Sequence, residues 1–133
     1  MEKFSFFTLP LFEDPRGALV TLEFKEKVPF TPQRLYYIFN TKEKRGGHAH
    51  REEQELFVCI KGTFTAKIHD GTQWHTFTFT APGQALYNDA LVWHEFDDFS
   101  DDAVMLAISS TSYDPERKGY IMDFDNFLKE FSA

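Results

Sequence analysis

A hairpin signal near the middle of the chain constrains the fold more than any other feature of the sequence. Residues 63–69 and 73–80 each alternate polar and apolar side chains, and the dipeptide Asp70-Gly71 lies between them. Alternating side chains point to opposite faces of a strand, and an Asp-Gly pair favours a tight turn between antiparallel strands. We therefore predict an antiparallel hairpin in this region.

Further short apolar segments, separated by turns rich in proline and glycine, extend this pattern along the chain. The predicted strands cover residues 4–11, 18–24, 33–39, 56–60, 85–87, 91–96 and 104–110. The tail differs, because Phe124, Phe127, Leu128 and Phe131 follow the spacing of one helix face and predict a helix over 123–131. Many short strands with one terminal helix predict an all-β antiparallel sandwich or closed barrel.

Length, charge and composition narrow the possible classes of protein. The 133 residues fit a single domain, residues 1–133, and the net charge of -7 disfavours binding to nucleic acid. No segment has the length needed to cross a membrane and the N-terminus lacks a secretion signal, so we expect a cytoplasmic protein. The lone Cys59 lies in an apolar run, which agrees with a buried thiol in a reducing compartment.

The segment 45–50 (RGGHAH) carries the clearest chemical signal in the sequence. His48 and His50 are separated by one residue, so both imidazoles point to the same face of an extended strand. Histidine changes charge near neutral pH and is the commonest metal ligand. The pair therefore indicates either proton transfer or metal binding, and its spacing alone does not choose between them.

The histidine pair and several residues after it, at fixed spacing, form a recognisable motif. They match the first motif of the cupin superfamily and a degraded form of the second: His48, His50, Glu55, Gly62, Pro82-Gly83 and His94. The resemblance implies a cupin jelly-roll barrel of antiparallel strands. The mouth of such a barrel collects these side chains around a cavity of ligand size.

Four stretches carry a closer resemblance: residues 14–17 (DPRG), 34–39 (RLYYIF), 45–50 (RGGHAH) and 92–95 (VWHE). Together they resemble the nucleotide-sugar 3,4-ketoisomerases, relatives of the dTDP-sugar 3,5-epimerases, over nearly the whole chain. The resemblance implies an isomerase that moves the ketone of dTDP-4-keto-6-deoxyglucose from C4 to C3 through an enediol, with no cofactor and no metal. It also implies a role in making 3-amino-3,6-dideoxysugars, and the stretch 14–17 favours the galacto product over the gluco product.

The proton transfers that such a reaction needs suggest a role for each polar side chain near the histidine pair. We assign His48 as the base at C3 and C4, with His50 relaying protons between sugar oxygens or to solvent, although the two roles could be exchanged. Tyr36 shares a predicted strand face with Arg34 and would donate a hydrogen bond to the enediolate oxygen. Tyr37 would take this role if the strand has the opposite register.

The resemblance to nucleotide-sugar enzymes also requires groups that bind the diphosphate and the base. The candidates for substrate binding are Arg16, Arg34, Arg45, Arg51, Trp93 and His94. Arg16 and Arg45 fit the diphosphate best, because a guanidinium group can pair with phosphate through two hydrogen bonds. Trp93 or Tyr87 offers an aromatic wall for thymine, although Trp93 fits the core equally well. His94 is expected to orient the site or to fill the core.

Two other functions stay open at this point. A metal-dependent cupin enzyme, such as an oxygenase, would use His48, His50, His94 and Glu55 as ligands. Against it, Glu55 neighbours Gln54, which faces the opposite way, so a shift of one residue in register would remove the carboxylate from the cavity. A non-catalytic sugar-binding cupin would leave the same histidines dispensable.

Two expectations concern the surface of the molecule. The aromatic N-terminal strand and the fold family suggest a homodimer with strand exchange. His69 and His75 flank the central hairpin, and we expect both to be exposed strand residues.

Overall fold

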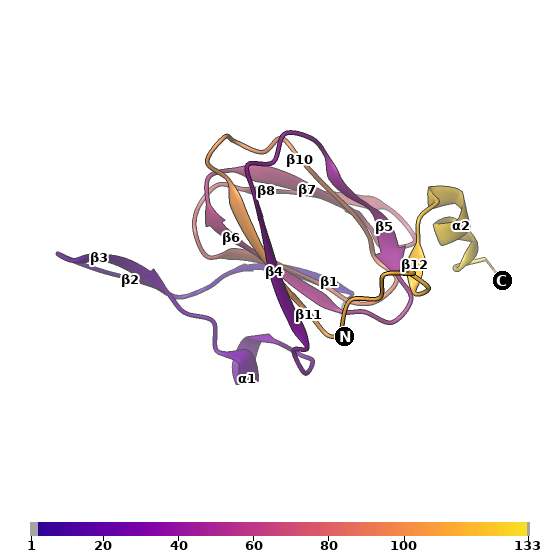
Figure 1. Ribbon diagram of the computed structural model, residues 1–133, viewed down its shortest axis with the longest axis horizontal. Coiled ribbons are helices and arrows are strands. Elements are labelled where there is room, and N and C mark those ends of the chain that lie inside the picture. The colour runs from indigo at the N-terminus through magenta and orange to yellow at the C-terminus, as the bar shows by residue number, and fades with distance from the viewer. Residues whose placement is uncertain (1–2, 133) are drawn as a thin grey trace.

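Two antiparallel sheets stack face to face and enclose the interior of the molecule (Figure 1). The computed structural model describes residues 3–132. The first sheet contains, in spatial order, the strands β1 (Phe4–Thr8), β9 (Gln84–Asn88), β6 (Glu55–Lys61), β11 (Val104–Ser109) and β4 (Arg34–Phe39). The second sheet contains β12 (Tyr120–Ile121), β5 (Arg45–His50), β10 (Trp93–Asp97), β7 (Phe64–His69) and β8 (Trp74–Phe79). The arrangement confirms the predicted all-β jelly-roll fold.

The predicted central hairpin is confirmed as β7 and β8. Phe64 lies opposite Phe79 at its open end. At the turn, the Asp70 carboxylate accepts hydrogen bonds from the backbone N–H groups of Thr72 and Gln73, at 2.8 and 2.9 Å. An aspartate that bonds its own turn in this way stabilises the reversal of the chain.

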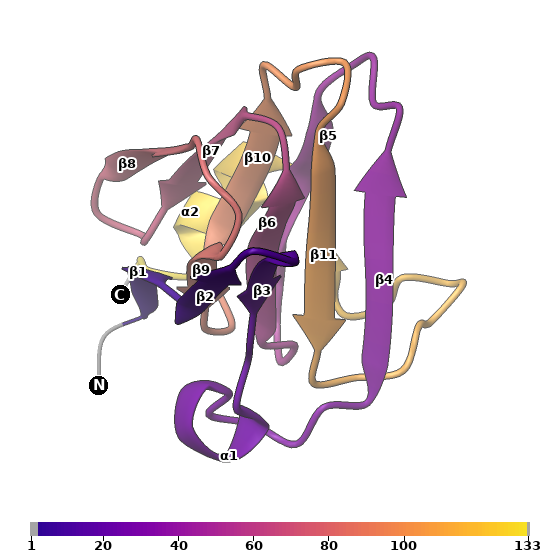
Figure 2. The same ribbon diagram turned by 90° about the vertical axis from the view of Figure 1, so that its left-hand side faces the viewer.

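The predicted C-terminal helix is confirmed as α2 (Phe124–Lys129), which is shorter than the apolar pattern suggested. Asp123 accepts a hydrogen bond from the backbone N–H of Asn126, which caps the helix. The helix covers the outer face of the second sheet, where Phe127 is fully buried beside Trp93 (Figure 2). Within residues 3–132, no helix is long and apolar enough to cross a membrane.

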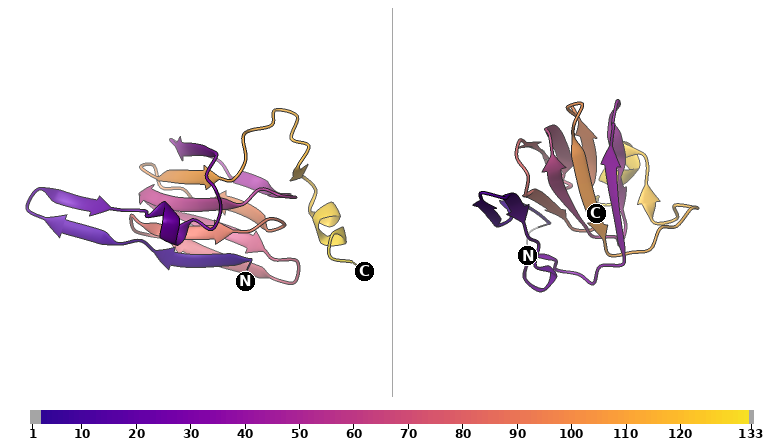
Figure 3. Two further views of the ribbon diagram at one scale, coloured as in Figure 1. Left: turned by 90° about the horizontal axis from the view of Figure 1, so that it is seen from below. Right: turned by 60° about the vertical axis from the view of Figure 1, so that its left-hand side comes forward.

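The N-terminal region differs from the predicted strands at 4–11 and 18–24. β1 ends at Thr8, and β2 (Leu11–Asp14) pairs with β3 (Gly17–Val20) in a separate two-stranded sheet. Pro10 lies at the break, because proline has no N–H to continue a ladder. The short helix α1 (Phe24–Lys27) occupies the end of the second predicted strand. The β2–β3 hairpin projects away from the two large sheets (Figures 1 and 3).

The interior consists of layers that run across the strands of the first sheet. One layer, called the site layer below, is polar and contains Arg34, Ser109, Glu55 and Asn88 as successive cross-strand partners. The next, called the core layer, contains Tyr36, Ala107, Phe57 and Leu86. The two layers lie only two residues apart on each strand, because every second side chain faces the interior. The polar residues therefore gather at one end of the barrel.

The prediction that His69 and His75 are exposed is wrong. His69 is 7% exposed, because α2 covers its side of the sheet and brings Phe124 to 5.3 Å from the imidazole, measured between ring centroids. His75 is half-buried, and its Nε2 lies 2.9 Å from Oδ2 of Asp70. The expected burial of Cys59 is confirmed, and its thiol is free.

Candidate active site

A hollow of about 320 Å³ opens beside the site layer, and we call it the active-site hollow. Its lining comes from β4, β5, β6 and the segment that follows β11: Arg34, Tyr36, Arg45, His48, His50, Glu55, Tyr113, Arg117 and Tyr120. The structure thus brings together side chains that are far apart in the sequence. The hollow therefore has histidines, a glutamate and arginines in its lining.

Three histidines meet at this end of the barrel. His48 and His50 lie on the same face of β5, as their spacing predicted, with ring centroids 4.9 Å apart. His94 is the cross-strand partner of His48 on β10, and these two ring centroids are 4.7 Å apart. Within the described part of the chain, His48 makes no hydrogen bond through its ring nitrogens, whereas Nδ1 of His94 lies 3.4 Å from the Val92 carbonyl oxygen.

Gly46 explains how the two histidine-bearing strands approach each other. The pairing of β5 with β10 shifts register between His94 and Glu95, directly opposite this glycine. A Cβ atom on Gly46 would lie 2.7 Å from the His94 carbonyl oxygen, and its φ of +84° suits glycine. The first glycine of the RGGHAH segment therefore permits the irregularity that places His94 beside His48.

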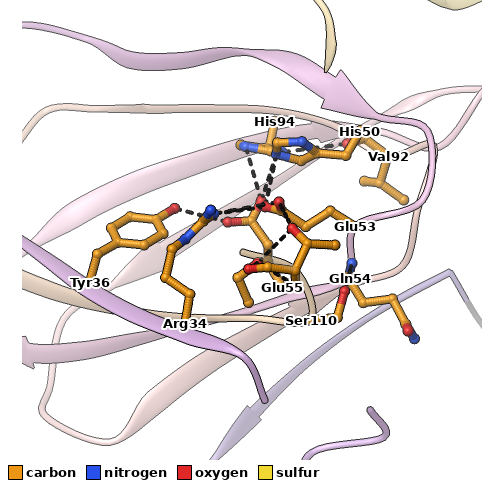
Figure 4. A network of polar contacts seen from close by, with 11 residues as sticks. Arg34, Tyr36, His50, Glu53, Gln54, Glu55, Val92, His94 and Ser110 are labelled. Atoms are coloured by element: carbon orange, nitrogen blue, oxygen red, sulfur yellow. Dashed lines mark hydrogen bonds and ion pairs between the residues drawn. The ribbon is translucent and has the colours of Figure 1, made fainter. Parts of the chain in front are cut away.

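Glu55 is the centre of the polar network in Figure 4. It is 2% exposed, and its Oε1 lies 2.9 Å from Nε2 of His50. The Tyr36 hydroxyl donates to its Oε2 at 2.9 Å. Burial, and next the Glu55 charge, raise the pKa of Tyr36 well above its ordinary value, which keeps that hydroxyl protonated. The pairing register of β6 therefore directs the Glu55 carboxylate into the cavity, and not Gln54.

Glu53 forms a second carboxylate contact on the other side of His50. Its Oε2 lies 3.4 Å from Nε2 of His50 and 3.3 Å from Nη2 of Arg34. The Thr111 hydroxyl donates a short hydrogen bond to its Oε1. Glu53 is 7% exposed, so Arg34 balances a buried charge here.

Burial sets the charge states around the hollow. Burial, together with the charge that His94 and His50 can carry, lowers the pKa of His48 to about 3. Burial likewise lowers the pKa of His94 to about 4, against the opposing effect of Glu55. For Glu55, burial alone would raise the pKa, but the hydrogen bond from His50 and the charge that His94 can carry hold it at about 2. His48 and His94 are therefore neutral at pH 7, while Glu55 is ionised.

Most of the residues predicted to form the site do lie at the hollow. Tyr36 faces inward and Tyr37 faces outward with 59% exposure, so the alternative role for Tyr37 is wrong in this register. Arg34 and Arg45 both line the hollow. Arg34 is already paired with Glu53, whereas Arg45 is exposed and forms no salt bridge within residues 3–132.

Three predicted binding residues, and the alternative Tyr87, lie elsewhere in this chain. Arg16 sits in the turn of the β2–β3 hairpin, where it pairs with Asp14 at 2.6 Å. Arg51 forms a salt bridge with Glu130 beside α2. Trp93 packs against α2, because it neighbours the inward-facing His94 and must point the opposite way. Tyr87 lies in a different apolar cluster, on the outer face of the first sheet.

The site also contains residues that the sequence did not reveal. Tyr113, Arg117 and Tyr120 come from the segment between β11 and the end of the chain, which loops away from the barrel and returns (Figure 3, right). No periodic pattern marks this segment, because it is mostly irregular. Glu53 was missed too, and its only signal is a carboxylate three residues after His50.

The spacing of the three histidines also bears on whether these residues could hold a metal ion. His48, His50 and His94 offer ring nitrogens within 4.8 Å of one another, which is the spacing of a ligand cluster. Nε2 of His50, however, lies 2.9 and 3.4 Å from two carboxylate oxygens. A ring nitrogen between two carboxylates is stable as an N–H donor, and a protonated nitrogen cannot bind a metal. His50, Glu53 and Glu55 form a second group with the same spacing, so the donor set suits proton transfer and would also suit a metal ion.

Comparisons with known proteins add independent evidence. The family model described as "FdtA: WxcM-like, C-terminal" matches residues 2–132. The chain is similar to a curated TDP-4-oxo-6-deoxy-alpha-D-glucose-3,4-oxoisomerase from Aneurinibacillus thermoaerophilus, with 42% identity over 118 residues that cover 87% of this chain and 84% of that protein.

Solved structures show the same likeness over the whole fold. The WlaRB TDP-quinovose 3,4-ketoisomerase from Campylobacter jejuni superposes with a TM-score of 0.88 and 31% identity, over 97% of this chain and 99% of that chain. A histidine-to-asparagine mutant of the 3,4-ketoisomerase QdtA from Thermoanaerobacterium thermosaccharolyticum was solved in complex with TDP-4-keto-6-deoxyglucose. It superposes with a TM-score of 0.88 and 26% identity, over 98% of this chain and 94% of that chain.

Proposed function

Because this chain belongs to the FdtA, WxcM-like family and is an isomerase, we propose that it moves the ketone of dTDP-4-keto-6-deoxyglucose from C4 to C3. The observation that carries this proposal is the position of His48, a neutral imidazole that lines the hollow and has no hydrogen-bond partner within residues 3–132. An unprotonated ring nitrogen at this position can accept a proton from a carbon beside a carbonyl. The names of the Aneurinibacillus relative and of the QdtA complex support the same substrate.

In the proposed mechanism, His48 removes the proton from C3 and leaves an enediolate. Tyr36 turns its hydroxyl from Glu55 to the developing oxygen at C4 and donates a hydrogen bond there, where a donor stabilises charge. His50 moves the hydroxyl proton from the C3 oxygen to the C4 oxygen, and the protonated His48 delivers a proton to C4. The C3 oxygen is then a ketone and the C4 oxygen a hydroxyl, with no net gain or loss of protons or electrons. In the free protein, Tyr36 donates a hydrogen bond to Glu55 and Nε2 of His50 lies 2.9 Å from the other oxygen of the same carboxylate, which fixes their relative position.

For the diphosphate, we propose Arg45 and Arg117 at the rim of the hollow. Both are exposed, and neither forms a salt bridge within residues 3–132. Guanidinium groups that are free of carboxylate partners can pair with phosphate oxygens. Tyr113, which is 51% exposed at the same rim, replaces Trp93 as the proposed aromatic wall for thymine.

We further propose a homodimer that exchanges the N-terminal hairpin. β2 and β3 expose Leu11, Phe12 and Leu19 on an element that projects from the two large sheets (Figure 3, left). Exposed apolar side chains on one projecting element suit a contact with a second copy. In such a dimer, Arg16 at the tip of the hairpin would reach the partner molecule, and this gives a route by which it could bind the diphosphate as predicted.

The proposal extends to the C4 configuration of the product, the compartment and the pathway. We favour the galacto configuration at C4 by analogy with the DPRG stretch, residues 14–17. We also propose a cytoplasmic enzyme that supplies 3-amino-3,6-dideoxysugars for lipopolysaccharide or S-layer glycans. NMR of the product formed from dTDP-4-keto-6-deoxyglucose gives the C4 configuration directly.

The proposal is tested with purified protein, dTDP-4-keto-6-deoxyglucose and NMR detection in heavy water. We expect conversion to the 3-keto sugar that a chelator does not change, and a His48→Asn variant that is about 100- to 10,000-fold slower. Full activity of this variant would remove the role of His48. Loss of activity on chelation would favour the metal-dependent alternative, and binding without conversion would favour the sugar-binding alternative.

A further inference from the structure

A second hollow of about 350 Å³ lies beside the active-site hollow. His50 lines both of them. Glu55 lines only the active-site hollow, whereas Glu53 and Thr111 line only the second one. His50 is therefore part of a thin wall between the site of chemistry and a separate opening.

Polar groups cross this wall in a continuous series. On the catalytic side, Nε2 of His50 lies 2.9 Å from Oε1 of Glu55. On the other side, the same nitrogen lies 3.4 Å from Oε2 of Glu53. The Thr111 hydroxyl, on a half-buried residue, donates to the remaining Glu53 oxygen. Neighbouring groups in the series are close enough that a small movement of the side chains would let a proton pass between them.

The surroundings of Glu53 suit a carboxyl group that takes up and releases protons. Burial, and next the Glu55 charge, raise the pKa of Glu53 above the ordinary carboxyl value. A carboxyl pKa that moves closer to that of an imidazole lowers the cost of a proton transfer between the two groups. The salt bridge with Arg34, at 3.3 Å, keeps this carboxylate in place beside His50.

We propose that Glu53 is a positioning and relay residue that exchanges the protons of the His48–His50 pair with solvent in the second hollow. The proton that His48 takes from C3 passes to the neighbouring His50, whose ring centroid lies 4.9 Å away, and then from Nε2 of His50 to Glu53. Glu53 releases a proton through the Thr111 hydroxyl to water, and the reverse sequence supplies a solvent proton for C4. Each group gains one proton as it loses one, and Glu53 itself does not touch the sugar. This inference rests on the proposed ketoisomerase function.

The test measures deuterium at C4 of the product after a single turnover in heavy water. In the wild type we expect most product molecules to carry deuterium, because the proton from C3 exchanges before it returns. Glu53→Gln keeps the shape of the side chain but cannot carry a proton, so the deuterated fraction should fall at least threefold. Glu26→Gln is the matched control, because Glu26 is exposed in α1 and lines neither hollow, and it should leave the fraction unchanged.

The deuterated fraction is a ratio within the product formed, so a variant that is partly unfolded still reports it. Thr111→Val provides a second variant that leaves the Glu53 charge in place, and it should lower the fraction in the same direction. Turnover with an unchanged deuterated fraction in both variants would overturn the relay but leave the isomerase function standing. A wild type that retains the original proton at C4 would also overturn the relay. A wild type that does not convert the sugar overturns the proposed function and the relay with it.

Discussion

The site layer and the core layer lie side by side in the same strands, yet they are built for opposite purposes. In the core layer, Phe57 is fully buried and its ring centroid lies 4.7 Å from that of Phe96. In the site layer, Asn88 is equally buried, but neither atom of its side-chain amide has a hydrogen-bond partner within the described part of the chain. Nη1 of Arg34, in the same layer, also lacks one.

This difference shows where the molecule gains stability and where it gives some up. Aromatic packing in the core layer removes apolar surface from water, which is the main driving force for folding. Unpaired buried polar atoms in the site layer cost stability but leave hydrogen-bonding capacity available for a ligand. A step of two residues along each strand therefore separates structural support from chemistry.

Phe57→Ala, a change in the core layer, should lower stability more than any other substitution considered for the two layers. Removing a fully buried aromatic ring from the core layer should lower the free energy of unfolding by about 3–5 kcal/mol. Asn88→Ala in the site layer should cost no more than about 1 kcal/mol, because its amide makes no hydrogen bond there. Urea denaturation of both variants measures the two values. Equal losses would mean that the layers do not differ in the way described.

Glu55→Gln should produce the next largest effect, and it should appear in activity. Tyr36 and His50 lose the negative charge that both contact, so we expect kcat to fall about 100-fold. The stability change should be smaller than for Phe57→Ala, since replacing a buried carboxylate also removes its desolvation cost. Single-turnover kinetics and urea denaturation separate these effects. Unchanged kcat would show that the carboxylate serves only the fold.

The site layer should also make stability depend on pH. The pKa values of His48 and His94, at about 3 and about 4, lie below the ordinary histidine value of 6.5. The unfolded chain therefore binds more protons, and the free energy of unfolding should fall as the pH drops from 6.5 towards 4. Glu55, at about 2 against an ordinary 4.5, adds a loss at lower pH in the same direction.

A His48→Gln variant should flatten this dependence. One fewer proton taken up on unfolding changes the slope by at most about 1.4 kcal/mol per pH unit between pH 6 and 4. Denaturation curves at several pH values measure the slope for the variant and the wild type. Identical slopes would show that burial does not hold His48 neutral.

The sequence alone predicted many of the side chains that face the interior in these two layers. Alternation with period two correctly placed Tyr36 with Arg34, and His48 with His50, on one interior face. The spacing of motif residues pointed to Glu55, and the direction of its side chain became certain only with the strand register. Local patterns succeed here because a strand fixes side-chain direction through its backbone geometry alone.

The remaining site residues depend on contacts between distant segments. Arg117 and Tyr113 belong to an irregular segment, and the path of such a segment follows from packing that no local pattern encodes. Trp93 takes the core role that the sequence had left open beside base binding, because α2 covers its face. Arg16 shows the same limit, since the placement of its hairpin depends on what the hairpin contacts.

Arg45→Gln tests the rim of the hollow, outside both layers, and should have the smallest effect. Arg45 is exposed and would contact only the diphosphate, which does not change during the reaction. Binding that is equal in the ground state and the transition state affects KM and leaves kcat unchanged. We expect KM to rise about 5- to 10-fold, the equivalent of roughly 1 kcal/mol for one charged contact partly screened by solvent. Lys42→Gln, which changes an exposed cation in the loop before β5, is the control and should leave KM unaltered. A fall in kcat with constant KM would instead move Arg45 from the binding rim into the chemistry of the site layer.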